Sequence, residues 1–87
     1  LILIGDADDW TPAAPCRDLA EQARRAGSDV TLVAYPGAYH NFDDPNEPVR
    51  VRSGVAYSAA GTGVVHQGTN PGARADALTR VPAFLRR

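Results

Sequence analysis

Two short polar stretches, roughly thirty residues apart, hold the residues that could carry acid–base chemistry. The first is Asp6-Ala7-Asp8-Asp9-Trp10, and the second, Ala38-Tyr39-His40-Asn41, holds a histidine. An imidazole titrates near neutral pH and can therefore act as a general base. A carboxylate beside it would orient the ring and stabilise its protonated form. The two stretches predict an aspartate–histidine pair, with the acid before the histidine in the chain.

Each stretch follows a run that is typical of a buried strand. Residues 1–4 are wholly apolar, and residues 30–35 are β-branched, apolar or aromatic up to the Pro36-Gly37 turn. Residues 13–26 between them have the spacing of an amphipathic helix that ends at Gly27. A strand–helix–strand unit pairs its strands in parallel, so both polar stretches should meet at one edge of the sheet. Ligands of α/β proteins bind at that edge.

The two motifs together resemble those of the dienelactone hydrolase family of α/β-hydrolases. The family's acid lies in a Gly-x-x-Asp-x-x-x-Pro setting, which here selects Asp8. Its histidine lies in a Tyr-x-x-x-x-His-x-Phe setting, which selects His40. The resemblance implies cleavage of a small-molecule ester or lactone by a Cys/Ser-His-Asp triad, without cofactor or metal. Asp8 would orient and charge-stabilise the imidazole, and His40 would be the general base.

The family's nucleophile has no counterpart in the sequence. It should lie upstream of the acid in a Gly-x-[Cys/Ser]-x-Gly elbow, which is absent, and Cys16 has no glycine frame and should be a core residue. The chain also begins on strand residues without Met. We therefore expect residues 1–87 to be the C-terminal part of a single α/β-hydrolase domain, with parallel strands, flanking helices and a long loop. The remainder of that domain should be its partner, and the isolated chain should be inactive.

One departure from the family bears on the substrate. Some members place an arginine four residues after the histidine to hold a substrate carboxylate, whereas this chain has Asp44 there. Dienelactone itself is therefore not the expected substrate. Arg50 and Arg52 are the candidate replacements, and solvated surface arginines are the default interpretation of both.

Two other classes of function remain open. The chain could be a truncated hydrolase relic or an interaction module without activity. An apolar strand followed by Asp-x-Asp is also typical of haloacid dehalogenase-like phosphatases, where Asp6 would be the nucleophile and Asp8 the acid, with magnesium between them. That pattern requires Thr or Val where Trp10 stands, and a downstream lysine, whereas the chain has no lysine. The phosphatase is the weaker hypothesis.

Composition narrows the range of partners. A formal net charge of −1 over 87 residues gives no indication of nucleic acid or an anionic membrane as partner. A single cysteine excludes an internal disulfide, and no Cys/His spacing indicates zinc. No apolar run approaches a membrane span and no signal peptide is visible, so we expect a cytoplasmic protein. A chain this small is marginal, and we expect exposed apolar surface.

The remaining expectations concern individual elements. Thr11 should cap the first helix, and residues 49–52 should form a short extended piece. Residues 53–72 should be a long irregular loop. A second helix is expected over residues 73–85, kinked or interrupted at Pro82.

The other polar and aromatic side chains near the two motifs are assigned smaller roles. Asp6 and Asp9 should be solvated or turn-forming. Trp10 should pack over the site. His66 should have no aspartate-bearing strand beside it and no role.

Overall fold

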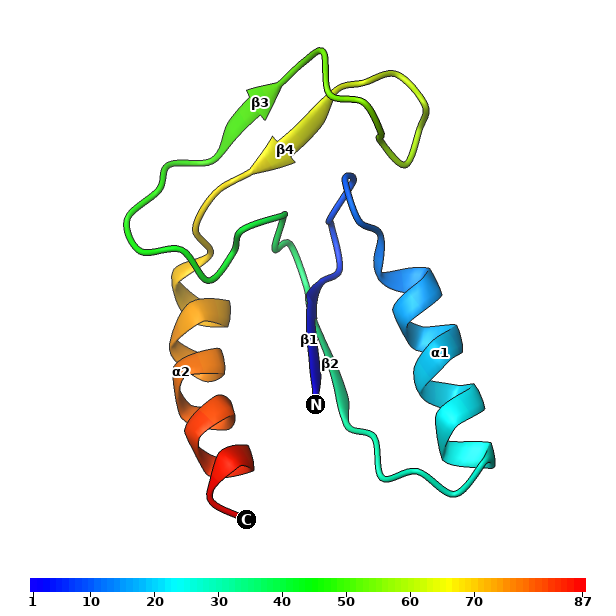
Figure 1. The fold of residues 1–87 in the computed structure, drawn as a ribbon. Coiled ribbons are helices and arrows are strands. Elements are labelled where there is room, and N and C mark those ends of the chain that lie inside the picture. Colours follow the sequence, from blue (N-terminus) through cyan, green and yellow to red (C-terminus); the bar gives the residue numbers. More distant parts are fainter.

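A two-stranded parallel sheet forms the centre of the molecule. The computed structural model describes all 87 residues. In chain order its elements are β1 (Ile2–Gly5), α1 (Ala13–Arg25), β2 (Leu32–Tyr35), β3 (Arg50–Arg52), β4 (Val65–Gln67) and α2 (Pro71–Leu85) (Figure 1). β1 pairs in parallel with β2, from Ile2 opposite Leu32 to Gly5 opposite Tyr35. The predicted parallel βαβ unit is therefore present, and both strands end at the same edge of the sheet.

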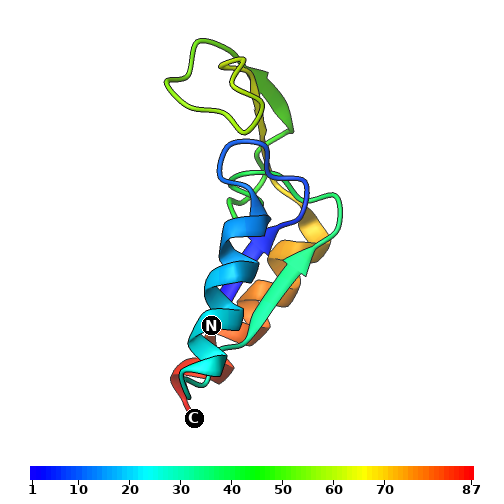
Figure 2. The ribbon, with the colours of Figure 1, turned by 90° about the vertical axis from the view of Figure 1, so that its right-hand side faces the viewer.

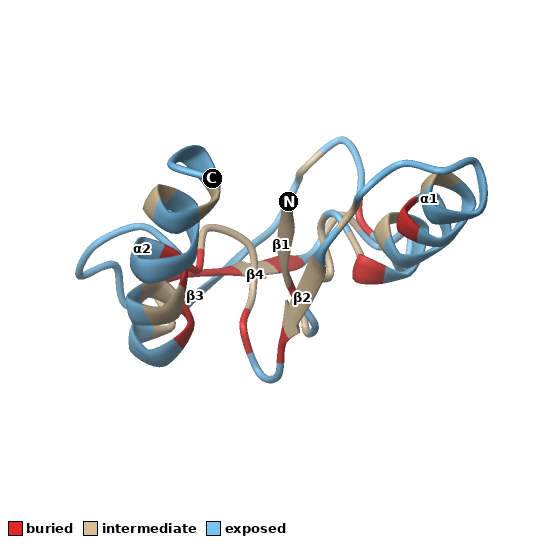
Figure 3. Ribbon diagram, turned by 90° about the horizontal axis from the view of Figure 1, so that it is seen from below, coloured by how far each residue is buried: buried red, intermediate tan, exposed pale blue.

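The two helices lie on opposite sides of this sheet, which gives three layers (Figure 3). On the α2 side, Ala73 and Ala77 pack in one cluster with Tyr35, Ala38 and Phe42. On the α1 side the buried residues are small, Ala13 and Ala20. The cluster thus includes the segment just after β2, which anchors the His40 loop to α2.

The prediction that Thr11 caps α1 is wrong. The N-cap residue is Pro12, which makes no side-chain capping bond, and the Thr11 hydroxyl is used elsewhere. Pro15 lies in the first turn, where its missing N–H would have had no partner within the helix. The helix ends at Arg25, Ala26 is its C-cap, and Gly27 follows as the predicted glycine after the helix, with a φ of 93° that glycine adopts without strain.

α2 begins earlier than predicted and is not interrupted. Its N-cap is Asn70, whose Oδ1 accepts a hydrogen bond from the Ala73 N–H at 3.1 Å, and Pro71 follows at the first helical position. The helix continues through Pro82 to Leu85. Pro82 removes one backbone donor, but its carbonyl still accepts from the Arg86 N–H at 3.1 Å, so the last turn closes.

The predicted irregular loop over residues 53–72 is only partly irregular. Residues 65–67 form β4, which pairs antiparallel with β3 so that Val51 lies opposite His66. The resulting hairpin lies beyond the carboxyl ends of β1 and β2 (Figures 1 and 2). A strand of three residues is too short to show an alternating pattern in the sequence. β4 is therefore defined by its pairing with β3 and not by a pattern of its own.

Apolar side chains remain exposed on both helices, as expected. Leu19 on α1 is 59% exposed, and Leu78 and Leu85 on α2 are 57% and 74% exposed. Neither helix has the length and apolar character needed to cross a membrane.

A polar contact joins β2 to α2. The buried Tyr35 hydroxyl donates to Asp76 Oδ2 at 2.7 Å, and Arg80 Nε donates to the same oxygen at 2.6 Å. Burial, and then the carboxylate of Asp76, raise the pKa of Tyr35 to about 12. The Tyr35 hydroxyl first, and Arg80 second, lower the pKa of the Asp76 carboxyl.

This contact predicts a loss of stability at alkaline pH. The pKa of Tyr35 is higher in the folded state, so its stabilising contribution is complete below pH 10 and disappears as the pH rises towards 12. Tyr35→Phe should be less stable than the wild type at pH 8 and lose less stability between pH 10 and 12. Urea unfolding at several pH values measures both. Equal alkaline slopes for the two proteins would contradict the assignment.

Candidate active site

Asp8 and His40 lie in contact beyond the carboxyl ends of β1 and β2. Asp8 Oδ2 is 3.1 Å from His40 Nδ1. The Asp8 side chain is only 4% exposed, whereas the His40 side chain is 29% exposed. The pair therefore combines a buried carboxylate with an imidazole that reaches the surface.

Three further hydrogen bonds hold the Asp8 carboxylate in place. The backbone N–H groups of Trp10 and Thr11 donate to Oδ1 at 2.9 and 2.8 Å, and the Thr11 hydroxyl donates to Oδ2 at 3.0 Å. Aspartate readily bonds the backbone just after it in this way. The Asp-rich turn thus fixes its own carboxylate, with Oδ1 towards the turn and Oδ2 towards His40.

This network determines which nitrogen of neutral His40 carries the proton. A carboxylate oxygen has no hydrogen to give, so Nδ1 must be the donor to Asp8 Oδ2. The Thr11 hydroxyl lies 3.2 Å from Nδ1. Because it donates its one proton to Asp8, it can only accept a hydrogen bond from the ring. Nε2 of the neutral ring is then left with its lone pair, and it makes no hydrogen bond within the chain. A base in a triad requires this tautomer.

Trp10 packs against the imidazole, as the sequence predicted. The two rings are 4.7 Å apart between centroids and tilted by 41°. The Arg52 guanidinium on β3 lies 5.5 Å above the Trp10 ring, and it donates to Gln67 Oε1 at 3.2 Å. Trp10 therefore restricts the movement of the His40 ring, and Arg52 places a positive charge beside Trp10.

Close backbone contact between the two loops fixes their separation. The Asp6 N–H donates to the Tyr35 carbonyl at 2.9 Å and the Ala7 N–H to the Ala38 carbonyl at 3.0 Å. Gly5 makes this approach possible, because a Cβ built there would lie 2.3 Å from the Ala38 carbonyl oxygen. Only a residue without a side chain fits at this point.

Gly5→Ala should consequently separate the two loops. Because the opposing atoms are backbone, the clash cannot be relieved by a side-chain rotation. We expect a loss of about 1–3 kcal/mol or more in unfolding free energy, as for other overpacked sites, measured by urea denaturation. Gly37→Ala serves as a comparison, because its Cβ would meet nothing within 4 Å. Any loss of stability in Gly37→Ala reflects the positive φ of 72° and not a steric clash. A Gly5→Ala protein as stable as the wild type would contradict the close contact.

The structure corrects the expectations for Asp9 and His66. Asp9 is not merely solvated, and His66 does have a carboxylate beside it. His66 Nδ1 lies 2.6 Å from Asp9 Oδ2, and the His66 N–H donates to Asp9 Oδ1 at 2.8 Å. Burial raises the pKa of Asp9, but the hydrogen bonds from His66 outweigh it and lower the pKa below its usual value. No local signal in the sequence could have revealed this pair, because Asp9 and His66 are 57 residues apart and meet only where β4 lies against the Asp-rich loop.

The other candidate residues do not join the pair. Asp6 forms an ion pair with Arg17, and Cys16 is partly exposed on α1 rather than in the core. Thr11 was missed as a site residue, although its position three residues after Asp8 is a recognisable turn signal. No group of three or more His, Cys, Asp or Glu residues could hold a metal ion.

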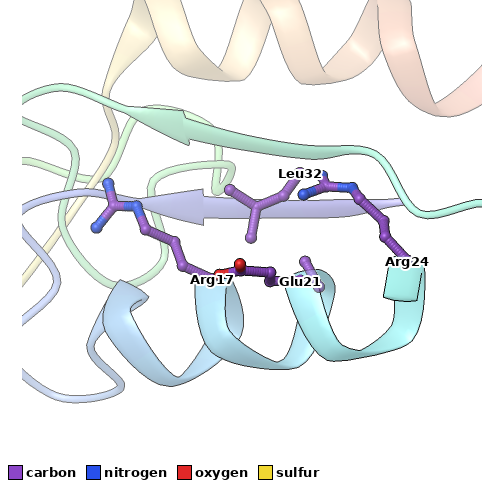
Figure 4. Close-up of a pocket in the computed structure, with 5 residues that line it drawn as sticks. Arg17, Glu21, Arg24 and Leu32 are labelled. Carbon is purple, nitrogen blue, oxygen red and sulfur yellow. The ribbon is translucent and has the colours of Figure 1, made fainter. Parts of the chain in front are cut away.

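The hollows of the surface lie away from the pair. The larger hollow has a volume of about 430 Å³ and is lined by the loop of residues 54–63. The other, of about 330 Å³, lies between α1 and β2 and is lined by Arg17, Ala20, Glu21, Arg24 and Leu32 (Figure 4). Neither hollow includes a residue of the Asp8–His40 pair.

A parallel βαβ unit with a carboxylate–imidazole pair at its carboxyl edge, acid before histidine, has the arrangement of the acid and base in α/β-hydrolases. The model of the dienelactone hydrolase family matches residues 1–87, and the chain therefore belongs to that family. Membership supports a hydrolase at the level of the family, and it favours this class over the phosphatase hypothesis. Searches among curated proteins and among solved structures gave no match to this chain.

Proposed function

We propose that this chain supplies the acid and the general base of a Cys/Ser-His-Asp triad that cleaves ester or lactone bonds. The 3.1 Å contact between Asp8 Oδ2 and His40 Nδ1 carries the proposal. The four hydrogen bonds on the buried carboxylate support it, because they leave Asp8 no freedom to turn away from the ring.

In this mechanism the nucleophile comes from the rest of the hydrolase domain, outside residues 1–87. His40 Nε2 takes the proton from the Cys or Ser as it attacks the carbonyl carbon. Asp8 stabilises the resulting imidazolium, which then gives that proton to the departing alcohol oxygen. In the second half of the reaction water attacks the acyl carbon, and His40 Nε2 takes the proton of the water. The bond to the Cys or Ser then breaks, the imidazolium returns the proton to that residue, and the carboxylic acid product leaves.

Turnover of a panel of small esters and lactones by the complete protein tests the proposal. We expect hydrolysis with an acyl-enzyme intermediate, visible as a burst of alcohol release or trapped as an adduct on a single Cys or Ser. A folded, complete protein that hydrolyses no member of the panel and forms no adduct would contradict it, and would favour a relic or an interaction module.

A further inference from the structure

A second carboxylate–imidazole contact lies directly beside the first. Asp9, the neighbour of Asp8, is bonded at both carboxylate oxygens by His66, through the backbone N–H at 2.8 Å and through Nδ1 at 2.6 Å. The His66 ring also stacks on Tyr39, the neighbour of His40, with centroids 4.8 Å apart and planes 18° apart. One residue of β4 thus contacts the immediate neighbours of both members of the pair.

The residues after His66 hold the histidine loop through the backbone. His40 and Gln67 form a parallel bridge, and the Gly68 N–H donates to the His40 carbonyl at 3.0 Å. Gln67 and Gly68 are buried. β4 therefore contacts the Asp-rich loop through His66 and the His40 loop through Gln67 and Gly68.

We propose that His66 is a positioning residue, which holds Asp9 and thereby keeps the Asp8 carboxylate against His40 Nδ1. The proposal rests on the proposed function for its effect on catalysis. The backbone of the Asp-rich loop is also tied to this region by the Ala59 N–H, which donates to the Asp9 carbonyl at 2.8 Å. Two charge-assisted bonds reach the Asp9 carboxylate from His66, one from its backbone N–H and one from its side chain, and only the side-chain bond depends on the identity of residue 66.

The second pair matters because the contact between Asp8 and His40 tolerates only a small displacement. Asp8 and His40 are on separate loops, and a shift of about 1 Å in a reacting group can cost about 100-fold in rate. The Asp8 turn fixes the carboxylate relative to its own loop. Backbone bonds from Asp6 and Ala7 hold the two loops together next to the strands, and β4 connects them at the Asp9 end. Loss of the His66 donor should loosen the Asp9 end of the Asp-rich loop, and with it the Asp8 carboxylate, without unfolding either loop.

Two substitutions of His66 separate the donor from the ring. His66→Phe keeps an aromatic ring against Tyr39 but removes the Nδ1 donor. His66→Asn removes the ring but places an amide N–H where Nδ1 lies. In the complete protein we expect kcat to fall about 10- to 100-fold in His66→Phe with little change in KM, and to recover most of its value in His66→Asn.

A second readout does not depend on activity. The Nδ1 proton of His40 should give a low-field proton resonance in the wild type, because it is held against a buried carboxylate. This resonance should broaden or vanish in His66→Phe and return in His66→Asn. If the complete protein had no hydrolase activity, the proposed function would fail, but this resonance would still decide the positioning role.

Opposite results would overturn the inference. It is wrong if His66→Phe keeps both its kcat and the His40 resonance, or if His66→Asn is as impaired as His66→Phe. Should His66→Phe fail to fold, Asp9→Asn is the second variant, since it keeps the side-chain shape but replaces one of the two carboxylate acceptors of His66 by an amide donor. A folded Asp9→Asn protein with an unchanged His40 resonance and unchanged kcat would likewise overturn it.

Discussion

Replacing His40 with alanine is expected to lower kcat/KM for ester or lactone hydrolysis by about 10⁴- to 10⁶-fold, as loss of the base does in other triads. His40 Nε2 is the nitrogen that would take the proton of the nucleophile, and the 29% exposed ring is the only imidazole that faces Asp8. Steady-state kinetics on the complete protein measure the loss.

The fold should survive this change. The His40 backbone is held by Gly68, and the ring is not part of the cluster formed by Tyr35, Ala38 and Phe42. Circular dichroism and thermal unfolding of His40→Ala should therefore resemble the wild type. Added imidazole should restore part of the turnover, because it can occupy the space of the ring. Retention of more than a small percentage of activity without imidazole would rule out His40 as the base.

Replacing Asp8 with asparagine should lower kcat by about 10⁴-fold, the effect of the equivalent change in a serine protease. Asp8 Oδ1 accepts two backbone N–H groups, so the amide oxygen of the introduced asparagine would take that place. The amide nitrogen would then face His40 Nδ1 and donate to it. This arrangement forces the proton onto Nε2, and the ring can no longer act as a base.

Asp6→Asn is the matched control for Asp8→Asn. It makes the same chemical change on the same loop, but Asp6 is exposed and pairs with Arg17 rather than with the imidazole. We expect Asp6→Asn to keep wild-type turnover. Equal kcat values for Asp8→Asn and Asp6→Asn would contradict the role given to Asp8.

The pairing of Asp8 with His40 could be anticipated because its signals are local. Two apolar runs with a helical segment between them require parallel strands, and each motif directly follows one strand. Trp10 was likewise placed over the site by its position in the Asp-rich loop. Their catalytic roles stay a proposal, whereas their geometry follows from the βαβ unit.

The second pair could not be anticipated, because it depends on tertiary contacts. β4 is a three-residue strand whose position is set by β3, and neither strand is long enough to show its register in the sequence. His66 and Asp9 are 57 residues apart and meet only once this hairpin lies against the Asp-rich loop. A threonine before a proline favours the N-cap position, so the sequence predicts Thr11 as the cap of the first helix. In the structure its hydroxyl bonds the Asp8 carboxylate instead.

The protonation of the His40 ring, observed by ¹⁵N NMR of the complete protein at a pH where the imidazole is neutral, tests the role of His40 as the base most directly. We predict a proton on Nδ1 and none on Nε2, and the reverse in Asp8→Asn. A neutral wild-type ring with its proton on Nε2 would contradict this role, because that ring could not accept the proton of a nucleophile.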